Sequence, residues 1–195
     1  MTPLVVVAVL VAAVMHASWN AIAHRIGDQL VASTLVGLSR VTCGVALVVA
    51  VGTPGGGAWP YLVASAAVHV VYQIMLMRSF TLGDFGQTYP IARGTAPIVV
   101  TVLAAVLVDE ELTGLAAAGL AVATAGLLGL ALWGFRSGAA RPRTPAVLAA
   151  VGTGLAISAY TVVDGMGIRA ADSTMGYIAW LTALDGLAVP AYAFL

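Results

Sequence analysis

The sequence predicts an all-α fold, a polytopic bundle of transmembrane helices. Hydrophobic residues make up 61% of the 195 residues and charged residues only 8%, whereas soluble domains are typically about 25% charged. The mean hydropathy of +1.03 agrees with this composition. Apolar runs of about 20 residues, the length of a membrane-spanning helix, recur seven times along the chain.

The seven runs correspond to predicted helices at residues 3–23, 30–51, 59–80, 85–108, 114–135, 145–168 and 174–195. Pro3 suits the first turn of the first helix, because the N–H that it lacks would have no helical partner there. The glycine- and proline-rich segment 52–57 ends the second helix with strong turn residues. Trp59 and Tyr61 begin the third helix, where amphipathic rings favour the membrane interface.

The later helix boundaries follow charged and capping residues. The acidic turn 109–111 ends the fourth helix, and Thr113 is a candidate N-cap for the fifth. A polar linker, residues 138–144, precedes the sixth helix, and the seventh run continues to the last residue, so we expect this chain to be part of a longer protein. The fifth helix also carries a stripe of small residues, which predicts close packing against another helix. The stripe consists of Gly119, Ala123 and Gly126.

The chain is predicted to contain one complete structural repeat and the beginning of a second. Residues 1–137 hold five helices, and residues 145–195 hold the first two helices of the second copy. An offset of 141 residues aligns the region of Trp19 with that of Tyr160. Because five is an odd number, the second copy would enter the membrane in the opposite sense. Such inverted repeats are characteristic of secondary transporters.

Residues 89–97 place two prolines and an arginine inside the fourth predicted helix. Pro90 and Pro97 each remove a backbone donor, and a guanidinium near the bilayer centre costs about 2.5 to 3.5 kcal/mol on insertion scales. Polar groups at that depth persist only where they face protein or a water-filled cavity. We therefore expect this segment to line a cavity, with Arg93 facing it.

Four predicted helices carry a polar or aromatic face that could line the same cavity. Several of the residues are four apart and so share one side of a helix. The candidate solute-binding residues are His16, Trp19, Asn20, His69, Tyr72, Gln73, Tyr89, Pro90, Arg93, Tyr160 and Asp164. The alternative for each is a structural hydrogen bond between helices, which stabilises a bundle by only about 0.6 to 2 kcal/mol.

Four of the charged residues fall inside predicted spans. Arg93 and Asp164 are expected to be functional, because ionisable groups in a membrane are costly to retain, and they could form an ion pair that opens during transport. Arg40 and Asp185 are expected to form a structural ion pair between the second and seventh helices.

Several function classes have no support in the sequence. Net charge is zero and lysine is absent, so no basic surface for nucleic acid is expected. Zinc, acyl-transfer and ATP-binding motifs are missing, and we predict no enzyme activity, catalytic residue, metal or cofactor. An acid dyad of Asp164 and Asp185 is the one enzymatic alternative, and Asp185 lacks the preceding Gly-x-Gly of intramembrane aspartyl proteases.

Three motifs resemble the EamA branch of the drug/metabolite transporter superfamily. They are His16-Ala17-Ser18-Trp19-Asn20, Tyr89-Pro90-Ile91-Ala92-Arg93-Gly94, and Glu110 in the turn before the fifth helix. The resemblance covers the whole chain. It implies two five-helix inverted repeats, ten spans in all, and movement of small metabolites or drugs by alternating access without ATP.

We therefore expect a multi-pass secondary transporter of a small organic solute in the plasma membrane. Its expected partners are the solute, the lipid bilayer, a coupling proton or ion, and a second copy of the chain in a homodimer. Asp164 or a histidine would carry the coupling proton. The alternative is a non-transporting membrane fragment whose polar residues only hold helices together.

Overall fold

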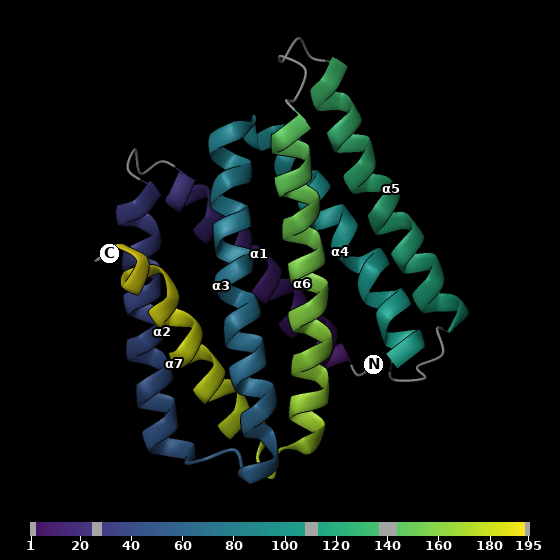
Figure 1. Ribbon diagram of the computed structural model, residues 1–195. Helices are drawn as coiled ribbons and strands as arrows, with labels where there is room; N and C mark the ends of the chain where they lie inside the picture. The colour runs from purple at the N-terminus through teal and green to yellow at the C-terminus, as the bar shows by residue number, and fades with distance from the viewer. Residues whose placement is uncertain (1–2, 25–28, 108–112, 137–143, 194–195) are drawn as a thin grey trace.

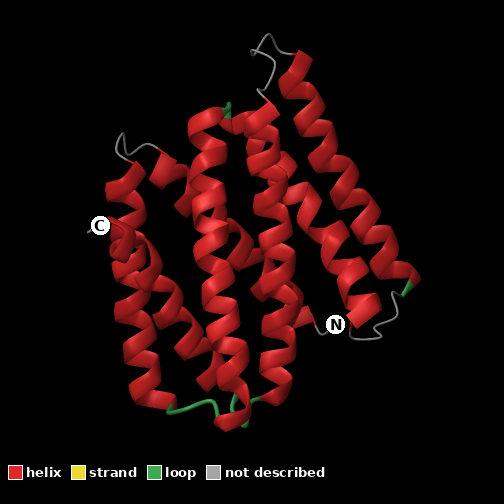
Figure 2. Cartoon of the chain, viewed as in Figure 1, coloured by secondary structure: helices red, strands yellow, loops and turns green. Residues whose placement is uncertain are grey.

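The computed structural model describes residues 3–24, 29–107, 113–136 and 144–193. Over these residues the chain forms α-helices and one short 3-10 turn, with no strand (Figures 1 and 2). The all-α prediction is therefore confirmed. The elements are α1 (Pro3–His24), α2 (Gln29–Val51), η1 (Gly56–Ala58), α3 (Trp59–Leu82), α4 (Phe85–Leu107), α5 (Gly114–Arg136), α6 (Thr144–Ala170) and α7 (Thr174–Ala193).

The helices from α2 to α6 are long and apolar enough to cross a membrane, which makes five candidate spans within the described residues. This finding agrees with the predicted membrane class. The same measure covers only part of α1 and α7, because both helices contain residues whose side chains lie outside the described part of the chain. The described apolar stretch of α1 is Pro3–Met15, and the first and seventh predicted spans are not tested by this measure.

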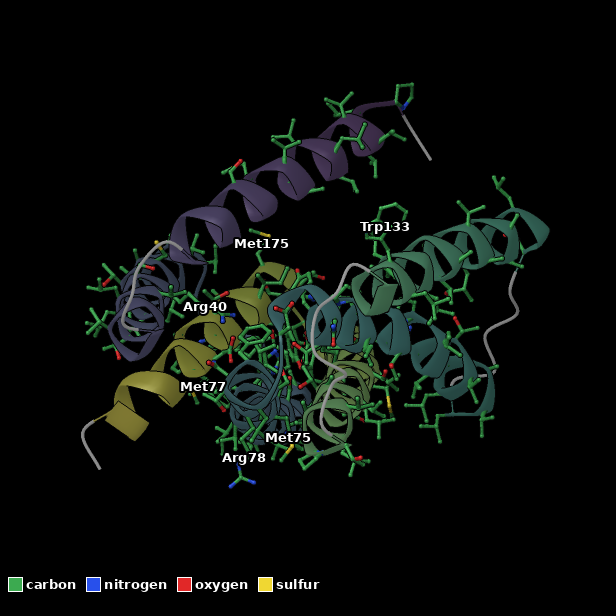
Figure 3. All side chains as sticks on the ribbon, turned by 90° about the horizontal axis from the view of Figure 1, so that it is seen from above. Arg40, Met75, Met77, Arg78, Trp133 and Met175 are labelled. Carbon is green, nitrogen blue, oxygen red and sulfur yellow. The ribbon has the colours of Figure 1, made fainter. Side chains whose placement is uncertain are left out.

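The helices alternate in direction, so that α1 and α6 point opposite ways (Figure 1). At the centre, α6 packs against α3 and α4, while α7 packs against α2 and α3, and α5 packs against α4. In contrast, α1 approaches α2 and otherwise stands apart from the bundle, as the view from above shows (Figure 3). The side chains of residues 3–15 in α1 are all exposed.

Small residues allow α4 and α6 to approach each other closely. The buried face of α6 consists mainly of alanine, glycine, serine and threonine. A Cβ atom on Gly154 would lie 2.7 Å from the Cβ of Thr95 and 2.8 Å from the carbonyl oxygen of Ala92. Ser158 adds a hydrogen bond from its hydroxyl to the carbonyl oxygen of Ala96, 3.0 Å away. Glycine at position 154 is therefore required by the distance between the two helices.

The crossing of α2 and α7 depends on glycine in the same way. A Cβ atom on Gly44 would lie 2.4 Å from the backbone nitrogen of Ala183. On the other helix, a Cβ atom on Gly186 would lie 2.8 Å from the carbonyl oxygen of Gly37. The two backbones are thus nearly in contact, and this crossing places Arg40 of α2 beside Asp185 of α7.

The small-residue stripe of α5 does not pack as predicted. Gly119, Ala123 and Gly126 are exposed, and no described atom would come within 4 Å of a Cβ on either glycine. Instead, α5 meets α4 through an adjacent face, where Leu127 lies against Gly94 and Ala131 is buried. The described part of this chain therefore does not supply the predicted contact, because helical spacing identifies a face without identifying its partner.

At one end of the bundle, the bottom of Figure 1, the α2–α3 loop and the α6–α7 loop lie against each other. The N–H of Asp172, between α6 and α7, donates to the carbonyl oxygen of Pro54, between α2 and α3, at 2.8 Å. Gly55 has a φ of 92° and approaches the Asp172 carboxylate so closely that a Cβ atom would not fit. Beneath the loops, Leu62 and Tyr177 are fully buried in a small apolar core.

Candidate functional site

Side chains from α3, α4 and α6 meet in the interior of the bundle. We name His69, Tyr72, Tyr89, Arg93 and Tyr160 the central polar cluster. The rings of His69 and Tyr160 are stacked with centroids 3.9 Å apart, and the Tyr72 ring meets the Tyr160 ring edge-on at 5.7 Å. The Arg93 guanidinium lies over the Tyr89 ring, 5.3 Å from its centroid. Helices far apart in sequence thus contribute to one site.

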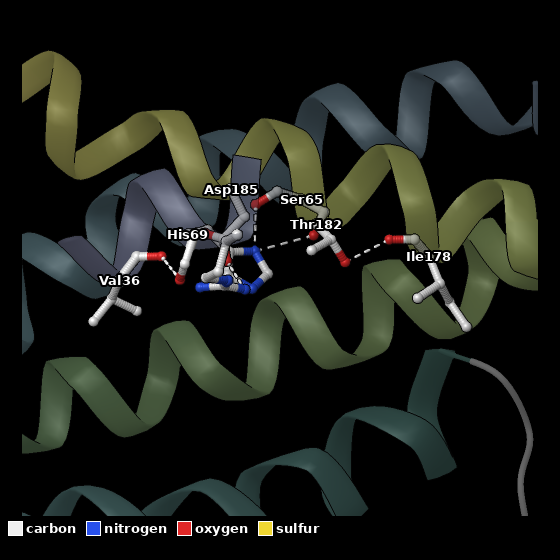
Figure 4. Close-up of polar contacts among 8 residues, drawn as sticks. Val36, Ser65, His69, Ile178, Thr182 and Asp185 are labelled. Carbon is white, nitrogen blue, oxygen red and sulfur yellow. Dashed lines mark hydrogen bonds and ion pairs between the residues drawn. The ribbon is translucent and has the colours of Figure 1, made fainter. Parts of the chain in front are cut away.

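The tautomer of His69 follows from its hydrogen bonds. Its Nδ1 lies 2.9 Å from the backbone carbonyl oxygen of Ser65 and 3.3 Å from the Ser65 hydroxyl (Figure 4). A carbonyl oxygen can only accept, so Nδ1 carries a proton and donates it. In the neutral ring, Nε2 is then left as an acceptor, and the stacking on Tyr160 fixes the ring plane.

Arg93 is partly buried near the middle of α4. Its electrostatic neighbours are tyrosines: it hydrogen-bonds Tyr89 and interacts with Tyr72 and Tyr160. Within the described part of the chain, no Asp or Glu lies within salt-bridge distance of its guanidinium. In this part of the chain, a permanently charged side chain therefore has tyrosine hydroxyls and one ring face as neighbours and no counterion.

Asp164 of α6 is bonded to the neighbouring helix instead of to Arg93. The Tyr177 hydroxyl donates to Oδ1 of Asp164 at 2.9 Å. Tyr177 is fully buried and its ring packs on Gly167, where a Cβ atom would lie 2.5 Å from the ring. The ion pair suggested between Arg93 and Asp164 is thus not formed in this structure, because Asp164 faces α7.

Arg40 and Asp185 form an ion pair between α2 and α7. The Asp185 carboxylate is buried, whereas 42% of the Arg40 side chain is exposed. Asp185 is within electrostatic range of both Tyr72 and Tyr160, so the pair borders the central polar cluster. Asp185 faces Arg40 and Asp164 faces Tyr177, so the two aspartates have separate partners, unlike the acid dyad of the enzymatic alternative.

The two prolines of α4 remove backbone N–H donors from the helix next to the central polar cluster. The helix continues through both Pro90 and Pro97, but neither residue has an N–H to donate to the preceding turn. Pro97 therefore frees the carbonyl oxygen of Arg93, on the residue that also carries the unpaired charge. Thr95 and Thr101 return their hydroxyls to carbonyl oxygens of the same helix, at 2.8 Å each.

The remaining predicted site residues lie outside the central polar cluster or outside the described residues. His16, Trp19 and Asn20 belong to α1, and their side chains lie outside the described residues. Pro90 is buried in α4, and Gln73 is partly buried on the His69 side of α3, one turn further on. The cluster therefore gathers residues from three of the four predicted faces.

Two contributors to the site were not predicted. Ser65 is four residues before His69, a spacing that could have identified it from the sequence. No sequence spacing identified Tyr177, because the turn between α6 and α7 brings it next to Asp164.

No group of three or more His, Cys, Asp or Glu that could hold a metal ion occurs among the described residues. Comparison with known proteins finds no match among family models, curated sequences or solved structures.

Proposed function

We propose that this chain belongs to a gradient-driven transporter that moves a small organic solute across the plasma membrane by alternating access. The observation that carries the proposal is the central polar cluster itself. An arginine with no counterion among the described residues, a histidine and three tyrosines lie between helices that are otherwise apolar enough to span a bilayer. Ionisable groups at such depth are typical of solute and ion pathways.

The packing of the helices supports the inverted repeat that the proposal includes. If α6 and α7 correspond to α1 and α2, the contacts of α6 with α3 and α4 predict equivalent contacts for α1. The third and fourth helices of a second copy would make them. The exposure of residues 3–15 and the opposite directions of α1 and α6 agree with this arrangement (Figure 1). The EamA branch of the drug/metabolite transporters, which the sequence resembles, has the same two-copy plan.

The contact between the α2–α3 and α6–α7 loops suggests how access would alternate. In the proposed mechanism, the Asp172–Pro54 hydrogen bond and the buried core around Tyr177 close one end of the bundle. A pathway from the cluster would open away from that end in this conformation. The Tyr177–Asp164 hydrogen bond joins the closed end to the interior, so a proton or ion that changes Asp164 would act on the closure directly.

A structural role for the polar residues is the second candidate. It is favoured by the Arg40–Asp185 pair and by the His69–Ser65 bonds, which satisfy those groups within the chain. It leaves the charge of Arg93 unexplained, and Arg93 is therefore the residue that separates the two candidates.

The test compares small molecules inside and outside cells that express the chain with those of cells that do not. We expect a defined set of compounds to be redistributed, and Arg93→Ala to abolish the change at unchanged membrane abundance. Arg78→Ala is the matched control, because Arg78 is exposed near the end of α3, and it should retain activity. If Arg93→Ala lowers abundance and activity together, Arg93 is structural. If no compound is redistributed, transport is refuted.

A further inference from the structure

We propose that the solute is a small organic anion and that its acid group binds the guanidinium of Arg93. This inference rests on the transport function proposed above and names the class of compound that the same site would take. It is carried by the distribution of charge among the interior side chains.

Two of the four charged groups in the described interior, Arg40 and Asp185, form an ion pair. Asp164 accepts a hydrogen bond from the Tyr177 hydroxyl and faces α7. Arg93 is the one cation among the four without a carboxylate within salt-bridge distance in the described residues. Guanidinium groups stay protonated under all ordinary conditions, and a buried charge is costly unless it is paired. An anionic solute would supply the missing charge.

The surroundings of Arg93 suit an acid group. Its guanidinium presents five N–H donors in a planar fork that matches a carboxylate, and Tyr89 occupies one side of it. The Tyr72 and Tyr160 hydroxyls lie within electrostatic range of the same guanidinium. Hydroxyls can donate to an acid oxygen but cannot neutralise the arginine, so the described neighbours of Arg93 offer hydrogen bonds and no negative charge.

A cationic solute would fit the same interior less well. At the central polar cluster it would need a carboxylate, but Asp185 is paired with Arg40 and Asp164 faces Tyr177 of α7. It would also approach the uncompensated charge of Arg93, and like charges in a low-dielectric interior repel strongly. The arrangement therefore selects for anions over cations of the same shape.

Three probes of similar size and different charge test this selectivity: benzoate, benzamide and benzylamine. The full chain is purified in an uncharged detergent, and its thermal unfolding is followed with each probe at the same concentration and ionic strength. A ligand that binds only the folded state raises the unfolding temperature. We expect benzoate to do so, and benzamide and benzylamine to have little effect.

Variants at position 93 locate the binding. Arg93→Gln should weaken the apparent benzoate affinity at least tenfold, and Arg93→Lys, which keeps the charge but not the fork, should weaken it less. Arg78→Gln is the control and should respond as the unmodified chain does. If the glutamine variant does not fold, the comparison of the three probes on the unmodified chain still tests whether the site prefers anions. A larger response to benzylamine, an unchanged response in Arg93→Gln, or no response to any probe would overturn the proposal.

The outcomes for binding and for transport can be told apart. If benzoate binds through Arg93 but no compound is redistributed in cells, the transport proposal fails and the anion site stands. If the compounds whose redistribution depends on Arg93 are cations or neutral molecules, transport stands and the anion proposal fails.

Discussion

Replacing Arg40 with methionine would leave a buried carboxylate without its counterion. Asp185 is 2% exposed, and neither of its oxygens accepts a hydrogen bond from the described residues. Among the described residues, the polar partner of Asp185 is therefore Arg40. Breaking a buried ion pair from one side costs about 3 to 5 kcal/mol. At about 1.4 kcal/mol per factor of ten, the unfolding equilibrium should shift by roughly two to four powers of ten.

A second substitution separates the ion pair from the loss of packing. Asp185→Asn keeps the volume of the side chain and removes its charge. In the double variant Arg40→Met with Asp185→Asn, the remaining cost is that of a buried polar group without a partner, about 1 to 3 kcal/mol. The double variant should therefore be more stable than Arg40→Met alone, by about 2 kcal/mol from the difference between these ranges.

The assay is unfolding in mixed micelles with increasing dodecyl sulfate, followed by circular dichroism. Arg78→Met is the control, because Arg78 is exposed and forms no ion pair among the described residues. A cost of less than about 1 kcal/mol for Arg40→Met would contradict the proposed role of the ion pair, as would additivity of the two substitutions within about 0.5 kcal/mol, which is typical of independent sites.

Three further predictions follow from the helix contacts and from the proposed function. Gly154→Ala should destabilise the bundle by about 1 to 3 kcal/mol in the same assay, because the added methyl group would force α4 and α6 apart. The control Gly119→Ala lies in open space and should be neutral or stabilising. Equal effects of the two substitutions would contradict the close crossing of α4 and α6. Tyr177→Phe should cost only about 0.6 kcal/mol, the mean for hydrogen bonds between membrane helices, because the ring still packs on Gly167; a loss above about 2 kcal/mol would give the Asp164 bond a larger role. Transport by protein reconstituted in vesicles should respond to an imposed pH gradient, and indifference to the gradient would rule out proton coupling.

The positions of the helices could be predicted because they depend on composition and local signals. Apolar runs of membrane-spanning length and the turn residues 52–57 fix most of the helix ends to within a few residues of the structure. The sequence also allowed the prediction that His69, Arg93 and Tyr160 lie close together. Polar residues are costly in hydrocarbon, so their side chains must face the interior of the bundle and therefore one another.

The choice of partner for each face could not be predicted, because helical spacing carries no information about which helix lies opposite. Gly119 and Gly154 are both glycines in apolar helices, yet only Gly154 lies at a close crossing. Asp164 faced Tyr177 instead of Arg93 for the same reason. The position of α1 beside α2, apart from α3, α4 and α6, is likewise a property of tertiary packing.

The presence of water at the central polar cluster is the most direct test of a transport pathway, and single cysteines can report it. Cys43, the exposed cysteine of α2, is first replaced by serine. Gln73→Cys then places a thiol on the His69 face of α3, and Val122→Cys places one on α5, at a side chain that is 74% exposed and would face lipid.

Both variants are treated with a membrane-impermeant maleimide, on intact cells and on inverted vesicles. Maleimide reacts with the thiolate, which forms in water and is suppressed in apolar surroundings. The proposed pathway predicts labelling of Gln73→Cys from at least one side of the membrane and none of Val122→Cys. Failure to label Gln73→Cys from either side, or equal labelling of both variants, would contradict a water-filled pathway at the cluster.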